Sequence, residues 1–564
     1  MNLVKQASDE LRQIILNSLG ECVAKGLLPA EAIPSFTIEI PADKTHGDFA
    51  TNVAMVCTKV FRMPPRKIAE AVCENVYLEN SLFEKVEVAG PGFINFFLSK
   101  KWYSLVIDNV LSEGDRYGRT HTGDGKKVMV EFVSANPTGP MHIGNARGGA
   151  IGDCLASVLD WAGYDVTREF YVNDAGNQIE KFATSLEVRY LQLYKDGVEL
   201  PADAYQGSDI IDHAKNFAEI NGDKYVEADS ADRRKALVDY ALPLNIAKLE
   251  SDLLKYRIKY DVWFLESGLH NSGKVLEVVD KLKAKGLAYE KDGAVLYKSN
   301  KQARNDEEIV DDVLVRTNGI PTYFAADIAY HYNKFEDRGF DKVIDVWGAD
   351  HHGHVARLKG AMSDLDINPD KLDVVLMQMV RLMRNGELVK VSKRTGKSIT
   401  LADLLEEIPI DAARFFFNLR EANSHFDFDL GLAVEQSSQN PVYYVQYAHA
   451  RICSILRTLE EEGVTPAEEG TDFTILSTAE ETDLIRLLAS FPNEIDEAAK
   501  HYDPARITKY SVDLATMFHK FYSACRVKGE AEDIMRARLA LCKAVKTAIK
   551  NCTEILKVDC PEKM

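Results

Sequence analysis

The spacing of apolar residues changes twice along the chain, and the changes predict three regions of different secondary structure. Residues 1–110 begin with an amphipathic helical pattern. They later carry the stretch FEKVEVAGPGFINFFLS, in which Pro-Gly separates two alternating runs. Alternation of apolar and polar residues is typical of half-buried strands, and Pro-Gly is typical of a turn. We therefore expect residues 1–110 to form a small α+β domain.

Strand-like runs alternate with helical ones in the second region, residues 120–405. It opens with the polar linker THTGDGKK, and its strand-like runs are VMVEFV, VTREFYV, KVIDVWGA and DVVLMQMV. This alternation predicts an α/β domain built on a parallel sheet. A charged helical block at about 180–305, which ends in the hairpin signal LAYEKDGAVLY, is interpreted as an insertion. Helical spacing dominates from 410 to 564 and predicts an all-α domain.

Length and composition narrow the class of protein. With 564 residues the chain is long enough for roughly three or four domains, and its 46% hydrophobic and 27% charged residues suit a soluble globular protein. No apolar run approaches the roughly 18 to 20 residues that span a bilayer. The N-terminal helix carries Asp9 and Glu10, unlike a signal peptide. Nine cysteines without a CxxC pair suit a reducing compartment, so we expect a cytoplasmic protein without a membrane partner.

The charge distribution bears on nucleic-acid binding. A net charge of −19 argues against a protein that coats nucleic acid non-specifically. Residues 501–550 nevertheless hold ten Lys and Arg against five Asp and Glu. This asymmetry permits a basic face on the last domain, although a solvated helix gives the same count.

The stretch EFVSANPTGPMHIGNAR predicts a strand, a sharp turn and a helix. Five apolar residues after His142 follow the spacing of one helix face: Ile151, Cys154, Leu155, Val158 and Leu159. His142 therefore lies near a helix N-terminus, where free N–H groups and the helix dipole favour an anion such as phosphate. The glycines around His142 leave the backbone open to a ligand.

A second phosphate-binding candidate lies in NGELVKVSKRTGKSITLADLL. A Walker A loop would need glycine where Val391 stands, and the glycines near His142 do not fit G-x-G-x-x-G. The stretch instead reads as a glycine-bounded lysine loop. It ends at Thr400, which can form a capping box with Asp403. Such a loop can close over a triphosphate and neutralise a departing pyrophosphate.

Together these motifs resemble a known family. PMHIGNAR is similar to the HIGH signature of class I aminoacyl-tRNA synthetases, and KVSKR is similar to their KMSKS loop. With GIPTYFAADIAYH, VWGADHHGH, SQNPVYYVQYAHAR, KTHGDFATNVA and the final CPEKM, the chain resembles the arginyl-tRNA synthetase family over nearly its full length. The resemblance implies a Rossmann-like catalytic domain and ligation of L-arginine to tRNA(Arg). Arginyl-adenylate and pyrophosphate would form from ATP first, in a step that needs tRNA.

The resemblance also implies roles for individual residues. Catalysis falls to His142, Asn145, Lys390 and Lys393, and ATP binding falls to Pro140, His142, Gly144, Asn145, Lys390, Ser392 and Lys393. Two departures from the family pattern stand out. The second histidine of HIGH is Asn145, which can donate a hydrogen bond but carries no charge. In the KMSKS loop, Val391 replaces methionine and Arg394 replaces the last serine, while both lysines remain.

A guanidinium substrate calls for a carboxylate in bidentate geometry. Tyr323 and Asp327 stand at i and i+4, so they share one face of a helix, as an ordinary amphipathic pair also would. Glu131 interrupts an apolar strand, and a cationic substrate would supply the partner that a buried carboxylate needs. The resemblance implies the arginine-binding set Glu131, Asn136, Tyr323, Asp327 and His351.

The stretch ADHHGH contains residue types that bind metals. It lacks the H-x-x-x-H and HExxH spacings of a helical site, and adjacent histidines would point apart on a strand. We therefore predict no metal site and no zinc. The Mg²⁺ that the reaction needs would arrive with ATP, held mainly by its phosphates.

The last domain is the candidate for anticodon recognition. DAARFFF resembles the start of a DALR-type anticodon-binding domain. Tyr443, Tyr447 and Arg451 combine aromatic and guanidinium planes that suit unstacked bases, although tyrosines in such a domain also fill its core. The first domain resembles the family's additional tRNA-binding module, and the family resemblance suggests a monomer.

Two other functions remain open at this stage. One is a small-molecule nucleotidyltransferase, whose chemistry does not need a long helical C-terminal domain. The other is a catalytically silent RNA-binding relative, which would not need His142, Lys390, Lys393 or Asp327.

Overall fold

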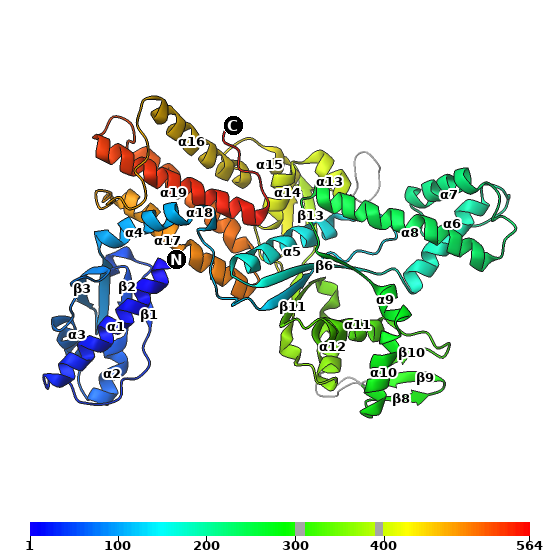
Figure 1. Ribbon diagram of the computed structural model, residues 1–564, viewed down its shortest axis with the longest axis horizontal. Helices are drawn as coiled ribbons and strands as arrows, with labels where there is room; N and C mark the ends of the chain where they lie inside the picture. The colour runs from blue at the N-terminus through cyan, green and yellow to red at the C-terminus, as the bar shows by residue number, and fades with distance from the viewer. Residues whose placement is uncertain (299–310, 390–398) are drawn as a thin grey trace.

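The computed structural model describes residues 1–298, 311–389 and 399–564. Three bodies follow one another along the chain, with the central sheet between the N-terminal domain and a long helical arm (Figure 1). Within the described residues, no helix has both the length and the apolar character needed to cross a membrane.

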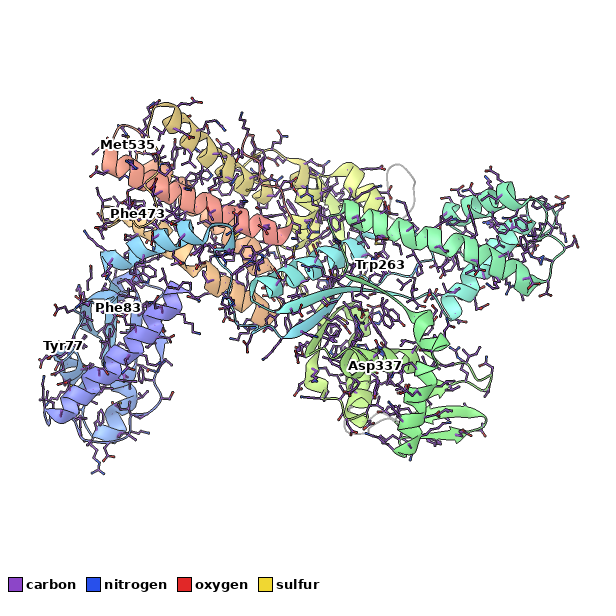
Figure 2. All side chains as sticks on the ribbon, in the orientation of Figure 1. Tyr77, Phe83, Trp263, Asp337, Phe473 and Met535 are labelled. Atoms are coloured by element: carbon purple, nitrogen blue, oxygen red, sulfur yellow. The ribbon has the colours of Figure 1, made fainter. Side chains whose placement is uncertain are left out.

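The N-terminal domain has the α+β composition predicted from the sequence. Its helices are α1 (Leu3–Ala24), α2 (Val53–Phe61) and α3 (Pro65–Glu74), with the short η1 (Lys44–His46). Its strands β1 (Ile38–Glu39), β2 (Phe49–Thr51), β3 (Phe83–Ala89) and β4 (Phe93–Leu98) form one antiparallel sheet in the order β1-β2-β4-β3. Phe83 is buried against Phe49 and Phe96, whereas Tyr77 is exposed at the edge of the domain (Figure 2).

A short segment fixes the N-terminal domain to the C-terminal helices. It comprises α4 (Lys100–Glu113), η2 (Gly114–Arg116) and the turn that follows. The buried Tyr117 donates its hydroxyl hydrogen to the Leu488 carbonyl oxygen at 2.6 Å. A Cβ on Gly118, which has φ +103°, would lie 2.3 Å from the Phe491 ring. The linker is therefore packed and not a free tether.

A five-stranded parallel sheet is the centre of the second body. Its order is β12-β11-β5-β6-β7, with β5 (Lys127–Glu131), β6 (Asp165–Val172), β7 (Val262–Leu265), β11 (Lys342–Gly348) and β12 (Leu372–Met377). All four pairings are parallel. The strands that the sequence predicts are confirmed, and the parallel α/β class with them. Helix α5 (Ile143–Trp161) is buried almost all round between the sheet and the C-terminal helices.

The bounds of the predicted insertion at about 180–305 are wrong, because strand β7 lies within that range. This strand pairs with β6 in the central sheet, so the chain returns to the sheet in the middle of that range. Before it, α6 (Asn177–Leu191), α7 (Ser208–Asn221) and α8 (Ser230–Lys255) enclose their own hydrophobic cluster and form the arm. A short apolar strand among charged helices gives too weak a periodic signal to be placed in a sheet by sequence alone.

After β7 the chain forms a small helical and antiparallel unit. It contains α9 (Glu266–Asn271), α10 (Lys274–Ala284) and the strands β8 (Ala288–Lys291), β9 (Ala294–Tyr297) and β10 (Asp312–Val315) in the order β10-β9-β8. Asp292 and Gly293 have φ angles of 51° and 79°, as the predicted hairpin turn requires. Then follow α11 (Tyr323–Tyr332), the π-turn η4 (Asn333–Asp337), η5 (Ala349–His351), α12 (His352–Asp364) and η6 (Pro369–Lys371).

A second small sheet joins the second body to the last domain. Its order is β14-β13-β15, with β13 (Val380–Arg384), β14 (Glu387–Leu388) and β15 (Phe426–Asp429). Helices α13 (Leu401–Glu407), α14 (Ile410–Phe417) and α15 (Leu430–Val434) lie around it. The DAARFFF helix, α14, packs against α5 and α16. Its buried Arg414 donates to Asp153 Oδ2 at 2.6 Å and to the Leu556 carbonyl oxygen at 2.9 Å.

The C-terminal domain is a bundle of four long helices, which confirms its predicted all-α class. They are α16 (Pro441–Glu461), α17 (Ala479–His501), α18 (Ala505–Ala524) and α19 (Glu532–Leu556). Helix α19 contacts α16, α17 and α18 and also reaches α4 and α5. The bundle therefore packs directly on the helix that begins at His142.

Candidate active site

His142 is the N-cap of α5, as the sequence predicts. The Gly144 N–H donates to His142 Nδ1 at 3.1 Å, and the His142 N–H donates to Asn145 Oδ1 at 3.1 Å. Partial desolvation lowers the pKa of His142, so the ring is neutral and Nδ1 can accept. A Cβ on Gly144 would lie 2.9 Å from His142 Cε1, which explains the glycine at this position. The H-x-G-N sequence thus fixes its own turn, with Pro140 exposed just before it.

The end of the lysine loop meets this turn. Thr400 and His142 form an isolated antiparallel β-bridge, and the Leu401 N–H donates to the Met141 carbonyl oxygen at 2.9 Å. Thr400 also forms the predicted capping box with Asp403, at 3.1 Å in each direction. Three predicted ATP-binding residues lie outside the described residues: Lys390, Ser392 and Lys393.

A cavity of about 380 Å³ opens at the carboxyl ends of β5, β6 and β11. Ligands of open α/β sheets bind at this edge. Four of the five predicted arginine-binding residues line the cavity, namely Glu131, Tyr323, Asp327 and His351. Asn136 does not line it; it is exposed on the segment between β5 and α5. The other polar and aromatic residues of the lining are Ser134, Tyr171, Asn173, Glu266, Phe324, Trp347, His354 and Arg357.

Three buried carboxylates stand in register across the sheet beside this cavity. Asp345 of β11, Glu131 of β5 and Glu169 of β6 are direct neighbours in the strand pairing. Helix α11 and the π-turn present cations to that row. Lys334 Nζ lies 2.6 Å from Glu131 Oε2 and 3.0 Å from Asp345 Oδ1. Arg338 pairs with Glu169.

This row corrects the sequence-based argument about Glu131. The buried carboxylate of Glu131 already has a cationic partner without a substrate, because Lys334 of the same chain supplies a positive charge. Burial raises the pKa of Glu131, while Lys334 opposes that shift. Breaking a buried ion pair by removing one partner costs roughly 3–5 kcal/mol. Glu131 therefore has a structural role beside the cavity that it lines.

This row of buried carboxylates is not predicted from the sequence, although the sequence shows the helical spacing of its cationic partners. His331, Lys334 and Arg338 stand at i, i+3 and i+7, which is the spacing of one helix face. Their carboxylate partners are in three separate strands, and the strand register that aligns them is set by the tertiary fold. The cationic face is visible in the sequence, but its partners are not.

Asp327 faces the cavity and is held by two histidines. His354 Nε2 contacts Asp327 Oδ2, and His331 Nδ1 lies 3.3 Å from Asp327 Oδ1. Burial alone would raise the pKa of Asp327, but these histidines outweigh it and hold the pKa well below its usual range. Tyr323 lies one turn earlier on α11, with 42% of its surface exposed, so the predicted pair shares a face at the cavity.

The histidines of ADHHGH have a different geometry from the one expected. His351 ends η5 and His352 begins α12, so neither is on a strand. His354 turns toward Asp327, and His351 lines the cavity. Across residues 1–298, 311–389 and 399–564, no three His, Cys, Asp or Glu side chains gather in a way that could hold a metal ion.

The three residues predicted to bind tRNA line one hollow of about 520 Å³ on the C-terminal domain. The rings of Tyr443 and Tyr447 are nearly parallel, with centroids 6.3 Å apart. Tyr447 also stacks on His519 of α18, at 6.0 Å. Arg451 lies 4.5 Å above the ring of Tyr522. His519 is a member of this surface that the sequence did not suggest.

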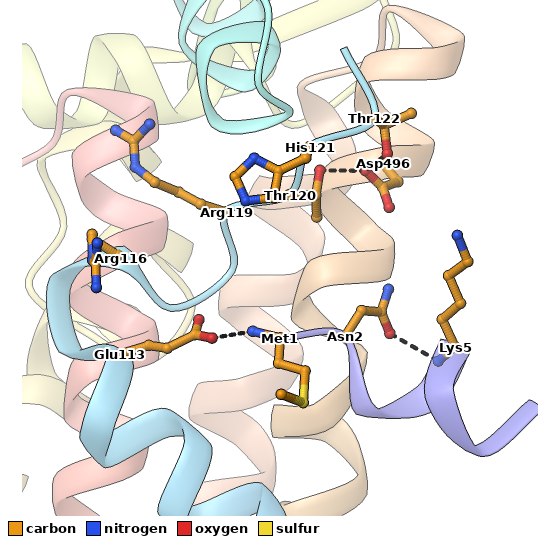
Figure 3. A pocket seen from close by; sticks show the side chains of 10 residues that line it. All are labelled: Met1, Asn2, Lys5, Glu113, Arg116, Arg119, Thr120, His121, Thr122 and Asp496. Atoms are coloured by element: carbon orange, nitrogen blue, oxygen red, sulfur yellow. Dashed lines mark hydrogen bonds and ion pairs between the residues drawn. The ribbon is translucent and has the colours of Figure 1, made fainter. Parts of the chain in front are cut away.

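Another cavity, of about 530 Å³, lies where the start of α1 and the linker meet α17 (Figure 3). Thr120 and Thr122 donate their hydroxyl hydrogens to Asp496 Oδ1, at 2.5 and 2.7 Å. These bonds attach the linker to α17. Arg116, Arg119 and His121 line the cavity, and none of the predicted site residues does.

Comparison with known protein families covers nearly the whole chain. Residues 9–98 match the model of the arginyl tRNA synthetase N terminal domain, residues 106–429 match the catalytic domain of tRNA synthetases class I (R), and residues 445–564 match the DALR anticodon binding domain.

Individual relatives agree with the family models. The chain is 56% identical to an arginine–tRNA ligase from Caldanaerobacter subterraneus subsp. tengcongensis over 564 residues, which is 100% of both chains. It is 54% identical to one from Ruminiclostridium cellulolyticum, again over 100% of both chains. The solved arginyl-tRNA synthetase of Thermus thermophilus has the same fold, with a TM-score of 0.73, 21% identity, and coverage of 99% of this chain and 100% of that one.

Proposed function

The chain belongs to the arginyl-tRNA synthetase family, and from that premise we propose which residues carry out each part of its reaction. The chain is an arginine–tRNA ligase: it activates L-arginine with ATP to arginyl-adenylate and pyrophosphate, then transfers arginine to the 3′-terminal adenosine of tRNA(Arg). The assignments below concern the site, the metal, the assembly and the location of the enzyme.

Asp327 binds the substrate guanidinium, and Tyr323 lines the same wall one turn away. The observation that carries this assignment is the Asp327 carboxylate at the cavity, held in place by His331 and His354, which also keep its pKa well below the usual range. A carboxylate and a guanidinium form two parallel charge-assisted hydrogen bonds, a geometry that the lysine ammonium cannot reproduce. Glu131 and His351 complete the lining, and Asn136 contributes from the adjoining segment.

ATP binds at the His142 turn. The N-terminus of α5 offers the positive end of a helix dipole to the phosphates, and the glycine at 144 keeps the backbone accessible. Asn145 uses its Oδ1 to cap the helix. Within the described part of the chain its Nδ2 has no partner, so Nδ2 can donate to a phosphate or ribose. Pro140 sets the entry to the turn.

Lys390, Ser392 and Lys393 complete the ATP site from the lysine loop. Support comes from Thr400, which follows this loop in sequence and bridges to His142. A lysine near a departing pyrophosphate stabilises its developing charge. We therefore assign Lys390 and Lys393 to transition-state stabilisation, together with His142 and Asn145.

Tyr443, Tyr447 and Arg451 bind tRNA(Arg) at unstacked bases. They line one hollow, and Tyr447 and Arg451 lie within the match to the DALR anticodon binding domain, residues 445–564. Base stacking on an aromatic ring contributes roughly 1–3 kcal/mol per base.

The remaining assignments concern the enzyme as a whole. Mg²⁺ enters with ATP and is held mainly by the phosphates, as is usual for an ion that keeps most of its ligands as water and phosphate oxygens. The enzyme acts in the cytoplasm as a monomer, and its domains span residues 1–110, 120–405 and 410–564. The match to all three family models argues against a small-molecule nucleotidyltransferase, and 56% identity to an arginine–tRNA ligase over the full chain favours an active ligase over a silent relative.

ATP–pyrophosphate exchange tests the residue assignments. Exchange with each of the twenty amino acids, with and without total tRNA, is expected with arginine only and only when tRNA is present. Asp327→Ala should raise the KM for arginine by roughly 10- to 100-fold with little effect on the KM for ATP, as expected for loss of a charged hydrogen bond. Lys393→Ala should slow adenylate formation and leave arginine affinity nearly intact. An unchanged arginine KM in Asp327→Ala would remove Asp327 from the site.

A further inference from the structure

The two histidines that hold Asp327 are in different protonation states. His331 Nδ1 lies 2.9 Å from the Asp327 carbonyl oxygen, and His331 Nε2 lies 2.9 Å from Asp345 Oδ2. A carbonyl oxygen and an ionised carboxylate only accept hydrogen bonds, so both ring nitrogens carry protons. Burial and the neighbouring Lys334 would lower the pKa of His331, but the Asp327 and Asp345 carboxylates outweigh them and raise the pKa to about 9. His331 is therefore an imidazolium behind Asp327.

His354 is neutral by geometry. Its Nε2 faces Asp327 Oδ2, while its Nδ1 lies 2.7 Å from Arg357 Nη2. A guanidinium has only donors, so Nδ1 must be the unprotonated, accepting nitrogen. The single ring proton is then on Nε2 and is donated to Asp327.

Arg357 is fixed in the position that imposes this tautomer. Its Nη1 donates to Asp312 Oδ1 at 2.9 Å, and its guanidinium lies 4.5 Å above the ring of Phe324. The His354 ring is bordered by Phe324 at 5.8 Å and by Trp347 at 5.7 Å. Aromatic walls and a bound guanidinium leave the imidazole little freedom to rotate.

The charged and titratable groups around His354 come from several elements. They are Asp327 and Tyr323 of α11, with His331 behind Asp327, Arg357 of its own helix α12, Asp312 of β10 beyond Arg357, and the cavity residues Glu131 of β5, Tyr171 of β6, Glu266 of α9 and His351 of η5. Of these, Asp327 and Arg357 contact the ring directly. A proton added at His354 Nδ1 would face the Arg357 guanidinium. The imidazolium formed in this way would carry a positive charge beside Asp327 and would compete with a substrate guanidinium for that carboxylate.

We propose that Arg357 keeps His354 as the neutral Nε2–H tautomer, and that His354 in this form is a positioning residue that orients Asp327 for the guanidinium of arginine. Arg357 thereby makes arginine affinity insensitive to pH near neutrality. The proposal rests on the proposed function of Asp327 in arginine binding, and it adds two residues to which that function assigns no role.

Arginine KM as a function of pH tests the proposal. The wild type, Arg357→Met, His354→Gln and the double variant are compared in aminoacylation of total tRNA between pH 8 and pH 6. Without the guanidinium, Nδ1 can take a proton. The arginine KM of Arg357→Met should therefore rise as the pH falls from 8 to 6, whereas the arginine KM of the wild type should stay nearly constant. Glutamine keeps an N–H donor but does not titrate, so the double variant should lose this pH dependence.

Each outcome is informative. A pH-dependent arginine KM in Arg357→Met that disappears in the double variant, with the KM for ATP unchanged, supports the proposal. An arginine KM that follows the wild-type pH profile in Arg357→Met overturns it, as does pH dependence that survives in the double variant. Asp327→Ala, measured in parallel, tests the role of Asp327 in arginine binding separately from the roles of Arg357 and His354. An unchanged arginine KM in Asp327→Ala contradicts the proposed function itself. Thermal unfolding of each variant confirms that it is folded at the assay temperature.

Discussion

Thr400 and His142, far apart in the sequence, form an antiparallel β-bridge. The bridge joins the residue that caps α13 to the residue that caps α5. Two helix N-termini are thereby attached to each other at the mouth of the proposed ATP site. The geometry of the His142 turn thus depends on the segment that follows the lysine loop.

Thr400→Ala should weaken ATP use through this connection. The substitution removes the capping hydroxyl that accepts from the Asp403 N–H at 3.1 Å, and loss of such a cap typically costs about 1 kcal/mol. We expect a lower unfolding temperature and a higher KM for ATP in pyrophosphate exchange. Thr478→Ala is the matched control, since Thr478 caps α17 by the same capping box, with Glu481. Equal KM values for ATP in the two variants would contradict the connection.

Gly144→Ala should impair ATP binding without unfolding the protein. The new Cβ would lie 2.9 Å from His142 Cε1, so the imidazole has to move from its capping position. We expect the KM for ATP to rise at least tenfold while the KM for arginine changes little. Gly360→Ala, in α12, meets no atom within 4 Å and serves as control; it should be neutral or stabilising by roughly 0.5–1 kcal/mol. Wild-type ATP use in Gly144→Ala would show that the ring position is unimportant.

Stability should fall as the pH rises from about 6.5 through 9 because of His331. Its pKa is raised in the folded protein to about 9 from an ordinary 6.5. A group whose pKa is higher in the folded protein adds to the free energy of unfolding. The full contribution is present below the pKa of the unfolded state, and it is lost as the pH rises through the pKa of the folded state. The contribution is on the order of 3 kcal/mol. His331→Asn should therefore flatten the stability profile between pH 6.5 and 9.5. NMR titration of the His331 ring gives an independent check, and a midpoint near 6.5 would refute the assignment.

Tyr447→Ala should weaken tRNA binding, and its tRNA-dependent ATP–pyrophosphate exchange should return to the wild-type rate at saturating tRNA. Tyr447 is 40% exposed and stacks with Tyr443 and His519 in the hollow of the anticodon binding domain. Loss of one stacked base predicts a Kd for tRNA(Arg) that is higher by about five- to 160-fold, corresponding to roughly 1–3 kcal/mol. Tyr194→Ala, at a 42% exposed tyrosine of the helical arm, is the control. An equal change in both variants, measured by filter binding, would argue against a specific stacking site.

The sequence by itself determined the features that depend on neighbours a few residues apart. The cap at His142, the capping box of Thr400 with Asp403, the Asp292-Gly293 hairpin and the shared face of Tyr323 and Asp327 all follow from local spacing. Backbone hydrogen bonds and turn angles act over such short distances, so the residue types needed for them are visible in sequence order.

Only the tertiary structure decided which distant residues meet. Glu131 pairs with Lys334 because β5 and β11 lie in register beneath the π-turn, and β7 entered the central sheet despite its place in a charged helical region. Asp327 gained His354 of α12 in the same way, whereas His331 stands at i+4 on its own helix, a spacing that is visible in the sequence. Pairings of this kind depend on how layers pack and on the free energy of burying charges, and neither quantity is encoded in local periodicity.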